Sequence, residues 1–286
     1  MTREHETTPA VPAWMEDIRR ETVDQVRKEA RLAGGSDWLD QPWSDLAENR
    51  PGDGLLEVAR RRRQAGETDL SWRIGADGED VVAAELRPLT HPRRRSRLFG
   101  ASTPPPMWRV LHGVKIGAAG IADLDHVVIG PPGVVVINTK QLDPRSRVRI
   151  IHGEISVGSR TTDFLAKAAR DARRTSWLLA SALEAVVARS SRGDLPSSWH
   201  VDLHEGVVNG HRERSRSDTD WLSVVPAVIF VGSGPIEGHP WPIVTRSNRL
   251  RESLLHRSRT LSDRQVEALY ELARRSTLWT RDAPSS

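Results

Sequence analysis

Acidic, amide and amine side chains stand at matched places in two neighbouring apolar segments. Asp123 and Asp125 precede one apolar run, and Asn138 and Lys140 follow the next. The segment Gly130–Gly133 separates the two runs. Asp and Asn are disfavoured in β-strands, so their presence at the ends of two strand-like runs needs a reason. Carboxylate and amide oxygens beside an ammonium group suit a hydrated Mg²⁺ next to a phosphodiester, and the pattern indicates such a cation site.

A β-hairpin that turns within Gly130–Gly133 would bring these side chains together. With the turn centred in that segment, Asp125 lies opposite Asn138, and Asp123 lies opposite Lys140. Directly opposed residues of an antiparallel pair share a face, with Cβ atoms about 5 Å apart. Periodicity alone also allows a simpler interpretation, in which the polar residues form a solvated strand end with an Asp–Lys cross-strand pair.

The same register divides the other hairpin side chains between two faces. The face of the acidic and amide groups carries Val127, Ile129, Val134 and Val136. The other face carries Leu124, His126, Val128, Val135, Ile137 and Thr139. His126 thus points away from the polar group, which favours packing over catalysis for this residue.

The basic residues are almost all arginine, which makes each lysine informative. The chain has 42 basic and 38 acidic residues, for a net charge of +4, and its lysines are Lys28, Lys115, Lys140 and Lys167. Lysine supplies a compact charge that can hold an attacking water or a phosphate oxygen, whereas arginine is bulkier and stays protonated. The choice of lysine at position 140 therefore adds weight to the cation-site interpretation.

Several classes of chemistry are absent from the sequence. There is no cysteine, which excludes disulfides, thiolate metal sites and cysteine nucleophiles. Walker, GxGxxG and His-Glu-x-x-His motifs are missing, and the ten histidines show no ligand-like pairs. The apolar run Val224–Val231 is too short to span a bilayer, and the start of the chain lacks the apolar core of a signal peptide. We therefore expect a soluble cytoplasmic protein without a membrane partner.

Helical and strand-like periodicities alternate along the chain, which favours an α/β fold. Residues 1–70 form a predicted helical or partly disordered appendage, 71–190 a core, and 191–286 strands and a helix that complete the same domain. We expect helices over residues 12–33, 53–65, 75–89 (with Asp77 as N-cap), 162–189 and from 262. We expect strands over residues 110–116, 122–129, 134–140, 147–157, 201–208, 224–231 and 243–245.

Three motifs in order resemble the nuclease-related domain (NERD) family of the PD-(D/E)xK restriction-endonuclease-like superfamily. They are Gly75-x-x-Gly78-Glu79 opening a helix, Leu124–Gly130, and Gly133–Lys140. The resemblance covers roughly Trp72 to Leu183, and a looser similarity continues to Trp279. It implies a mixed β-sheet flanked by helices, here with an N-terminal helical appendage, and an active site at the open end of the hairpin.

The resemblance also implies roles for individual residues. Glu79, Asp125 and Asn138 would hold Mg²⁺ or Mn²⁺, and Lys140 would be the catalytic lysine. Glu85 is placed much like Glu79 on the expected helix, so helical geometry alone does not choose between them. The family pattern has an acid where this chain has Asn138, so the site loses one negative charge, and we expect weaker metal binding and slow or absent hydrolysis.

The resemblance implies a metal-dependent nuclease-like protein that hydrolyses phosphodiester bonds in DNA, with RNA as the alternative partner. Nucleic-acid contacts would come from Lys167, Arg170 and Arg174 on one face of the long helix. The alternative to an enzyme is a catalytically inactive, nuclease-derived module that binds nucleic acid or protein. The oligomeric state stays open.

Overall fold

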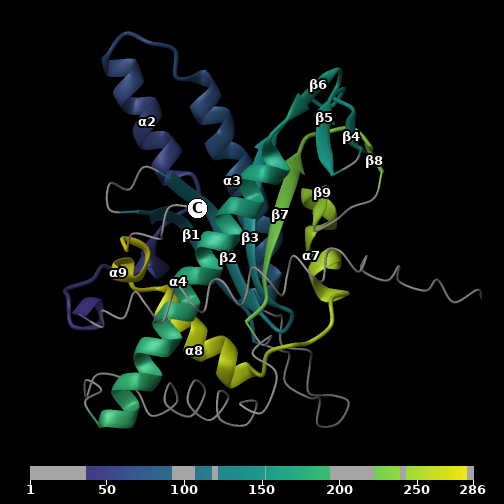
Figure 1. The fold of residues 1–286 in the computed structure, drawn as a ribbon. Coiled ribbons are helices and arrows are strands. Elements are labelled where there is room, and N and C mark those ends of the chain that lie inside the picture. Colours follow the sequence, from purple (N-terminus) through teal and green to yellow (C-terminus); the bar gives the residue numbers. More distant parts are fainter. Residues whose placement is uncertain are drawn as a thin grey trace, which may run out of the picture.

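Two mixed β-sheets flanked by helices make up the computed structural model, which confirms the expected α/β class (Figure 1). The structure describes residues 37–91, 107–117, 122–151, 153–193, 222–238 and 243–281. The larger sheet has the strand order β1-β2-β3-β7-β9, and the smaller has the order β6-β5-β4-β8. In the larger sheet β1, β2 and β3 are antiparallel neighbours, and β7 and β9 continue it in parallel with β3.

The strands of the larger sheet are β1 (Arg109–Ile116), β2 (Ala122–Gly130), β3 (Gly133–Gln141), β7 (Val224–Val231) and β9 (Val244–Arg246). Those of the smaller sheet are β4 (Val148–Ile151), β5 (Glu154–Val157), β6 (Arg160–Thr162) and β8 (Ile236–Glu237). The helices are η1 (Asp37–Leu39), η2 (Leu46–Glu48), α2 (Asp53–Gln64), α3 (Leu70–Thr90), α4 (Phe164–Arg192), α7 (Ser247–Leu255), α8 (Asp263–Ala273) and α9 (Ser276–Trp279).

Helices cover both faces of the larger sheet because its central strands are apolar on both sides. Val128 and Val135 lie in one core with Val82 and Leu86 of α3 and with residues of α7. The alternate side chains of the same strands lie in a second core with residues of α4, α8 and α9. Nearly every residue of β3 is buried, as expected for a strand with a helical layer on each face.

The β2–β3 hairpin has the expected register near its turn. Ile129 pairs with Val134, and Val127 pairs with Val136. The ladder ends at the pair His126–Ile137, however, so the expected pairing of the polar residues beyond that point is not part of it.

The expected division of the hairpin into two faces is wrong for Leu124. Leu124 packs in the same core as Val127 and Ile129, because side-chain alternation breaks between residues 124 and 127. The paired strand β1 breaks its alternation at the matching place, between Leu111 and Val114, where Gly113 has a φ of 54°. Asp123 consequently pairs across the β1–β2 ladder with Lys115, rather than with Lys140.

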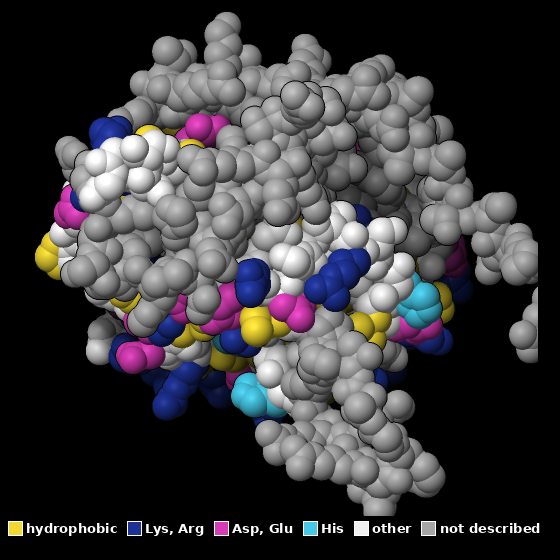
Figure 2. Space-filling view, turned by 90° about the horizontal axis from the view of Figure 1, so that it is seen from below, with side chains coloured by type: hydrophobic (Ala, Val, Ile, Leu, Met, Phe, Trp, Pro, Cys, Tyr) yellow, Lys and Arg dark blue, Asp and Glu magenta, His cyan; other side chains and the backbone are white. Residues whose placement is uncertain are grey.

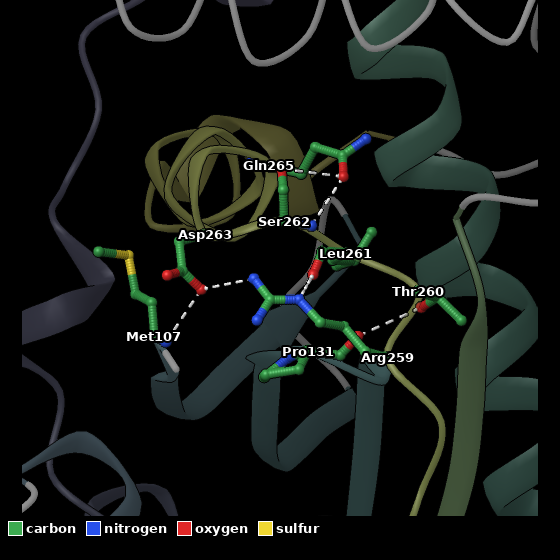
Figure 3. A network of polar contacts seen from close by, with 8 residues as sticks. All are labelled: Met107, Pro131, Arg259, Thr260, Leu261, Ser262, Asp263 and Gln265. Atoms are coloured by element: carbon green, nitrogen blue, oxygen red, sulfur yellow. Dashed lines mark hydrogen bonds and ion pairs between the residues drawn. The ribbon is translucent and has the colours of Figure 1, made fainter. Parts of the chain in front are cut away.

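At the other end of the hairpin, the turn is bound to the segment that leads into α8. On the face of the molecule seen from below, the described Lys and Arg side chains lie among Asp and Glu side chains (Figure 2). The carbonyl oxygen of Pro131 accepts hydrogen bonds from the backbone N–H groups of Thr260 (2.7 Å) and Leu261 (2.9 Å). It also accepts one from the Thr260 hydroxyl at 3.4 Å (Figure 3). Ser262 and Gln265 then form a capping box at the start of α8, where the sequence predicts a helix. These hydrogen bonds hold the turn against the segment that leads into α8.

Several expected elements differ from the structure in their bounds. Helix α3 begins at Leu70, so Asp77 lies inside the helix and Asp69 is the N-cap residue. The single strand expected over residues 147–157 is the hairpin of β4 and β5, because Gly153 supports a turn with a φ of 79°. Helix α7 was not expected. The predictions for residues 12–33 and 201–208 lie outside the described residues, and the three-part division of the chain stays a prediction.

Within the described ranges, no helix combines the length and the apolar character that crossing a bilayer requires.

Close packing at the hairpin turn yields a stability prediction. A Cβ atom added to Gly130 would lie 2.2 Å from Cε3 of Trp108. Gly130→Ala should therefore lower the free energy of unfolding, toward the upper end of the about 1–3 kcal/mol typical of overpacking. Chemical denaturation measures the loss. Gly153→Ala is the control, because no atom lies within 4 Å of the added Cβ and only the left-handed backbone is strained. Equal losses in the two variants would contradict the packing argument.

Candidate metal and catalytic site

Asp125 lies where the hairpin ladder ends, and its carboxylate binds the neighbouring strand. Its Oδ2 accepts a hydrogen bond from the backbone N–H of Thr139 at 2.5 Å. Burial raises the pKa of Asp125, while the Lys140 ammonium and the Thr139 N–H oppose that rise. The carboxylate thus replaces the next backbone pair of the ladder and stands next to the lysine that follows Thr139.

Glu79 reaches the same region from α3, which covers the face of the larger sheet opposite to α4. It is 5% exposed, and its Oε2 accepts a hydrogen bond from the backbone N–H of Gly52 at 2.9 Å. Burial, followed by the charge of Asp125, raises the pKa of Glu79 to about 8. A carboxyl group of this kind holds a proton at neutral pH unless a cation favours its charged form.

The partner of Glu79 comes from the segment that precedes α2. Gly52 has a φ of 76°, and a Cβ atom there would lie 2.9 Å from Cβ of Ala76 in α3. Asn49, three residues earlier, donates from Nδ2 to the carbonyl oxygens of His112 (3.2 Å) and Gly113 (3.1 Å). These contacts hold the Gly52 N–H against Glu79, and the sequence carried no signal for them beyond the presence of glycine.

Lys140 lies near the end of β3, on the face that α4 covers. Its Nζ lies 5.2 Å from the centroid of the Phe164 ring and donates to the carbonyl oxygen of Thr139 at 3.1 Å. Burial lowers the pKa of Lys140, and the charges of Asp125 and Glu79 oppose that decrease. The lysine is thus an electrostatic neighbour of both carboxylates.

Asn138 is buried, and its amide oxygen is unused. The residue is 4% exposed, and Oδ1 has no hydrogen-bond partner within the described part of the chain. A buried polar atom without a partner is costly, so an orphaned oxygen is a notable feature of this strand. Oxygen donors from Glu79, Asp125 and Asn138 are of the type that Mg²⁺ prefers, and these three residues could hold such an ion.

This donor set fits a hard divalent cation, although it contains only two carboxylates. Across residues 37–91, 107–117, 122–151, 153–193, 222–238 and 243–281, no three His, Cys, Asp or Glu side chains form a metal-binding group.

Helix α4 contributes two further charged groups, of which the sequence predicted only Lys167. Lys167 Nζ pairs with Asp171 Oδ2 at 3.1 Å, and both charges act on the pKa values of Asp125 and Lys140. Asp171 was not among the expected site residues, although its position four residues after Lys167 on the same helix is the spacing of an ion pair.

Of the expected nucleic-acid contacts, only Lys167 lies near the carboxylates. Arg170 extends toward Asp163 at 4.0 Å and is exposed. Arg174 lies beside Gly117 at the end of β1, where its Nη2 would be 2.9 Å from an added Cβ. Their role as nucleic-acid contacts stays a prediction.

Two other residues weighed from the sequence lie close to this region. Asp123 lies near the first turn of α2, with Oδ1 buried and unpartnered within the described residues, and its charge contributes to the raised pKa of Glu79. His126 is fully buried, and its Nδ1 lies 2.8 Å from Nδ1 of His112 on the neighbouring strand. Burial lowers the pKa of both imidazoles, which fits the expected packing role for His126.

Residues 74–194 match the family model described as a nuclease-related domain (NERD). No curated protein and no solved structure matches the chain significantly. The matched range contains Glu79, Asp125, Asn138 and Lys140, and it begins after Gly52 and after all of α2. The observed mixed sheet with flanking helices is consistent with the restriction-endonuclease-like fold that the sequence motifs imply.

The raised pKa of Glu79 yields a prediction about stability and pH. Because its pKa lies above the usual 4.5, the metal-free fold loses stability as pH rises from 4.5 toward 8. Glu79→Gln removes this titration. The free energy of unfolding of the variant should therefore increase relative to that of the parent protein as pH rises. The difference should grow by up to about 1.4 kcal/mol per pH unit. Chemical denaturation at a series of pH values, with a chelator present, measures it.

Glu85→Gln makes the same chemical change at a partly exposed position of the same helix and should not reproduce the effect. A stability difference between Glu79→Gln and the parent protein that does not change with pH would contradict the burial of an ionisable Glu79.

Proposed function

Because residues 74–194 of this chain carry a nuclease-related domain, we propose that the protein is a metal-dependent nuclease that hydrolyses phosphodiester bonds in DNA. The observation that carries the proposal is the electrostatic contact among Glu79, Asp125 and Lys140 at the open end of the hairpin. Two carboxyl groups with raised pKa values and a lysine with a lowered one, gathered from different elements, are typical of functional sites.

In this proposal, two of the three oxygen donors are oriented by hydrogen bonds from backbone N–H groups. Glu79 is oriented by the Gly52 N–H, Asp125 is oriented by the Thr139 N–H, and the free amide oxygen of Asn138 completes the set. When bound there, Mg²⁺ or Mn²⁺ would neutralise charge that develops on the phosphate during hydrolysis. The burial of both carboxylates strengthens their interaction with a cation, since little water screens it.

Lys140 acts on the nucleophile in this proposal. It is held between the Thr139 carbonyl and the Phe164 ring, which fixes its ammonium beside Asp125. From there it would position the attacking water by hydrogen bonding. Its lowered pKa brings it closer to accepting the proton of that water than an exposed lysine would be.

With Asn138 in place of an acid, the proposed metal site has one negative charge fewer than the superfamily pattern, so it should bind metal more weakly. A unit-charge pair 4 Å apart is worth about 4 kcal/mol at an effective dielectric constant of 20, before desolvation is counted. The missing charge gives specific support to a second function, a catalytically inactive domain that binds nucleic acid. DNA binding without cleavage under any divalent cation would favour that alternative.

Replacement of the lysine tests the enzymatic proposal. Lys140→Ala should reduce Mg²⁺- or Mn²⁺-dependent cleavage of supercoiled and linear DNA by about 100-fold or more, because it removes the group that positions water. Gel electrophoresis of the products over time measures the rate. Lys115→Ala, which removes the same charge from exposed Lys115 on β1, should retain most of the activity. Equal cleavage by the parent protein and Lys140→Ala would refute the role of Lys140.

Restoring the acid at position 138 tests the metal site itself. Asn138→Asp should melt at a lower temperature than the parent protein without metal, because it adds a buried charge beside two carboxyl groups. Added Mg²⁺ should then raise its melting temperature by more than it raises that of the parent protein.

Asn248→Asp, at an exposed position of α7, is the matched control and should show neither effect. If Mg²⁺ shifts the melting of Asn138→Asp and of the parent protein by the same amount, Asn138 does not belong to the metal site.

A further inference from the structure

The segment between η2 and α2 carries a side chain that binds the larger sheet beside the candidate site. Asn49 donates from Nδ2 to the carbonyl oxygens of His112 (3.2 Å) and Gly113 (3.1 Å) in β1. The carbonyl oxygen of Arg50 also lies close to β1, 3.7 Å from the position that a Cβ atom would take at Gly113. Asn49 therefore joins the segment to one particular place in β1.

That place in β1 lies directly opposite Asp125. The residue pairs on either side of Gly113 and Asp125 belong to the β1–β2 ladder, whereas Gly113 and Asp125 themselves are not paired in it. The amide of Asn49 thus binds β1 at the irregularity that faces Asp125. Local departures from regular strand pairing, such as bulges, often re-aim a side chain beside an active site.

The same segment ends at the backbone donor that binds Glu79. The N–H of Gly52, three residues after Asn49, donates to Glu79 Oε2 at 2.9 Å. Gly52 lies so close to α3 that an added Cβ atom would be 2.9 Å from Cβ of Ala76. The hydrogen bond to Glu79 therefore depends on where the segment lies. Asn49 is thus connected through the backbone to Glu79 as well as to Asp125.

Contacts on both sides of Asn49 hold the rest of the segment to the protein. Leu46 of η2 is buried, and its backbone N–H donates to the carbonyl oxygen of Arg274 at 2.8 Å. Arg274 Nε also donates to Asp45 Oδ1 at 3.0 Å. On the other side, α2 packs against α3 (Figure 1). These anchors do not involve the side chain of Asn49, so we expect its replacement to change mainly the local geometry of the segment.

We propose that Asn49 is a positioning residue of the metal site and orients Glu79 and Asp125 for a divalent cation. This inference rests on the proposed metal-dependent function and adds to it a residue outside the matched range 74–194. Asparagine suits the role because its amide NH₂ group can donate to two carbonyl oxygens at once. Replacing a group that orients metal ligands typically lowers metal affinity by about 10- to 100-fold.

Mn²⁺ binding to the full chain, measured by isothermal titration calorimetry without nucleic acid, tests the proposal. Asn49→Ala removes both hydrogen bonds to β1 without a change of charge. We expect this variant to bind Mn²⁺ at least about tenfold more weakly than the parent protein. Asn248→Ala makes the same change at an exposed position of α7 and should bind Mn²⁺ as the parent protein does.

A general loss of stability would not produce this result. Gly130→Ala should lower the free energy of unfolding at the opposite end of the hairpin, but it should keep the Mn²⁺ affinity of the parent protein. Circular dichroism at the titration temperature identifies the variants that are folded. If Asn49→Ala is unfolded, Asn49→Ser, which keeps one hydroxyl donor, takes its place and should show a smaller loss in the same direction.

The outcomes separate the positioning role from the proposed function. Equal Mn²⁺ affinity in the parent protein and in the folded variants at position 49 would overturn the role of Asn49 and leave the metal-dependent function standing. A parent protein that binds no Mn²⁺ would overturn both. Equally weakened binding by Gly130→Ala and Asn49→Ala would show that the loss follows stability, and would also overturn the role of Asn49.

Discussion

The hydrogen bond from the Thr139 N–H to the Asp125 carboxylate determines how the rest of the candidate site is arranged. A regular antiparallel ladder would have satisfied that N–H with a backbone carbonyl, and the acid would have extended to solvent. Because the ladder ends at His126–Ile137, the carboxylate turns inward and is partly buried between two strands. A buried carboxylate requires a nearby positive charge or a proton. Lys140 meets part of that requirement, and a bound cation would meet the rest.

A second constraint follows from the first, because Glu79 is buried close enough to Asp125 for each charge to affect the other. Burial raises the pKa of Glu79, and the charge of the adjacent Asp125 raises it further, since two neighbouring carboxyl groups are unstable when both are ionised. The fold accepts this cost and also leaves Asn138 Oδ1 without a partner within the described residues. Groups that destabilise the metal-free protein at one place are the usual sign of a site arranged for a ligand.

The sequence by itself determined the local parts of this arrangement. Alternating apolar residues and the Pro131–Pro132 turn set the hairpin register near the turn, since period-two patterning admits one register when both faces are buried. Ser262 and Gln265 marked the start of α8, because a capping box depends only on residues three apart. The order of Glu79, Asp125, Asn138 and Lys140 along the chain also sufficed to indicate a shared site, by resemblance to a known family.

Only the tertiary structure decided which groups surround those four residues. Gly52 meets Glu79 across 27 positions of sequence, and the charge of Asp171 acts on Asp125 from α4, so neither interaction has a local pattern. The face of Leu124 depended on paired irregularities in β1 and β2, which periodicity in one strand cannot reveal. Whether an arginine is paired also depends on what folds beside it. Such contacts are fixed by packing between distant segments, whereas helix caps and hairpin registers are fixed by neighbours in the chain.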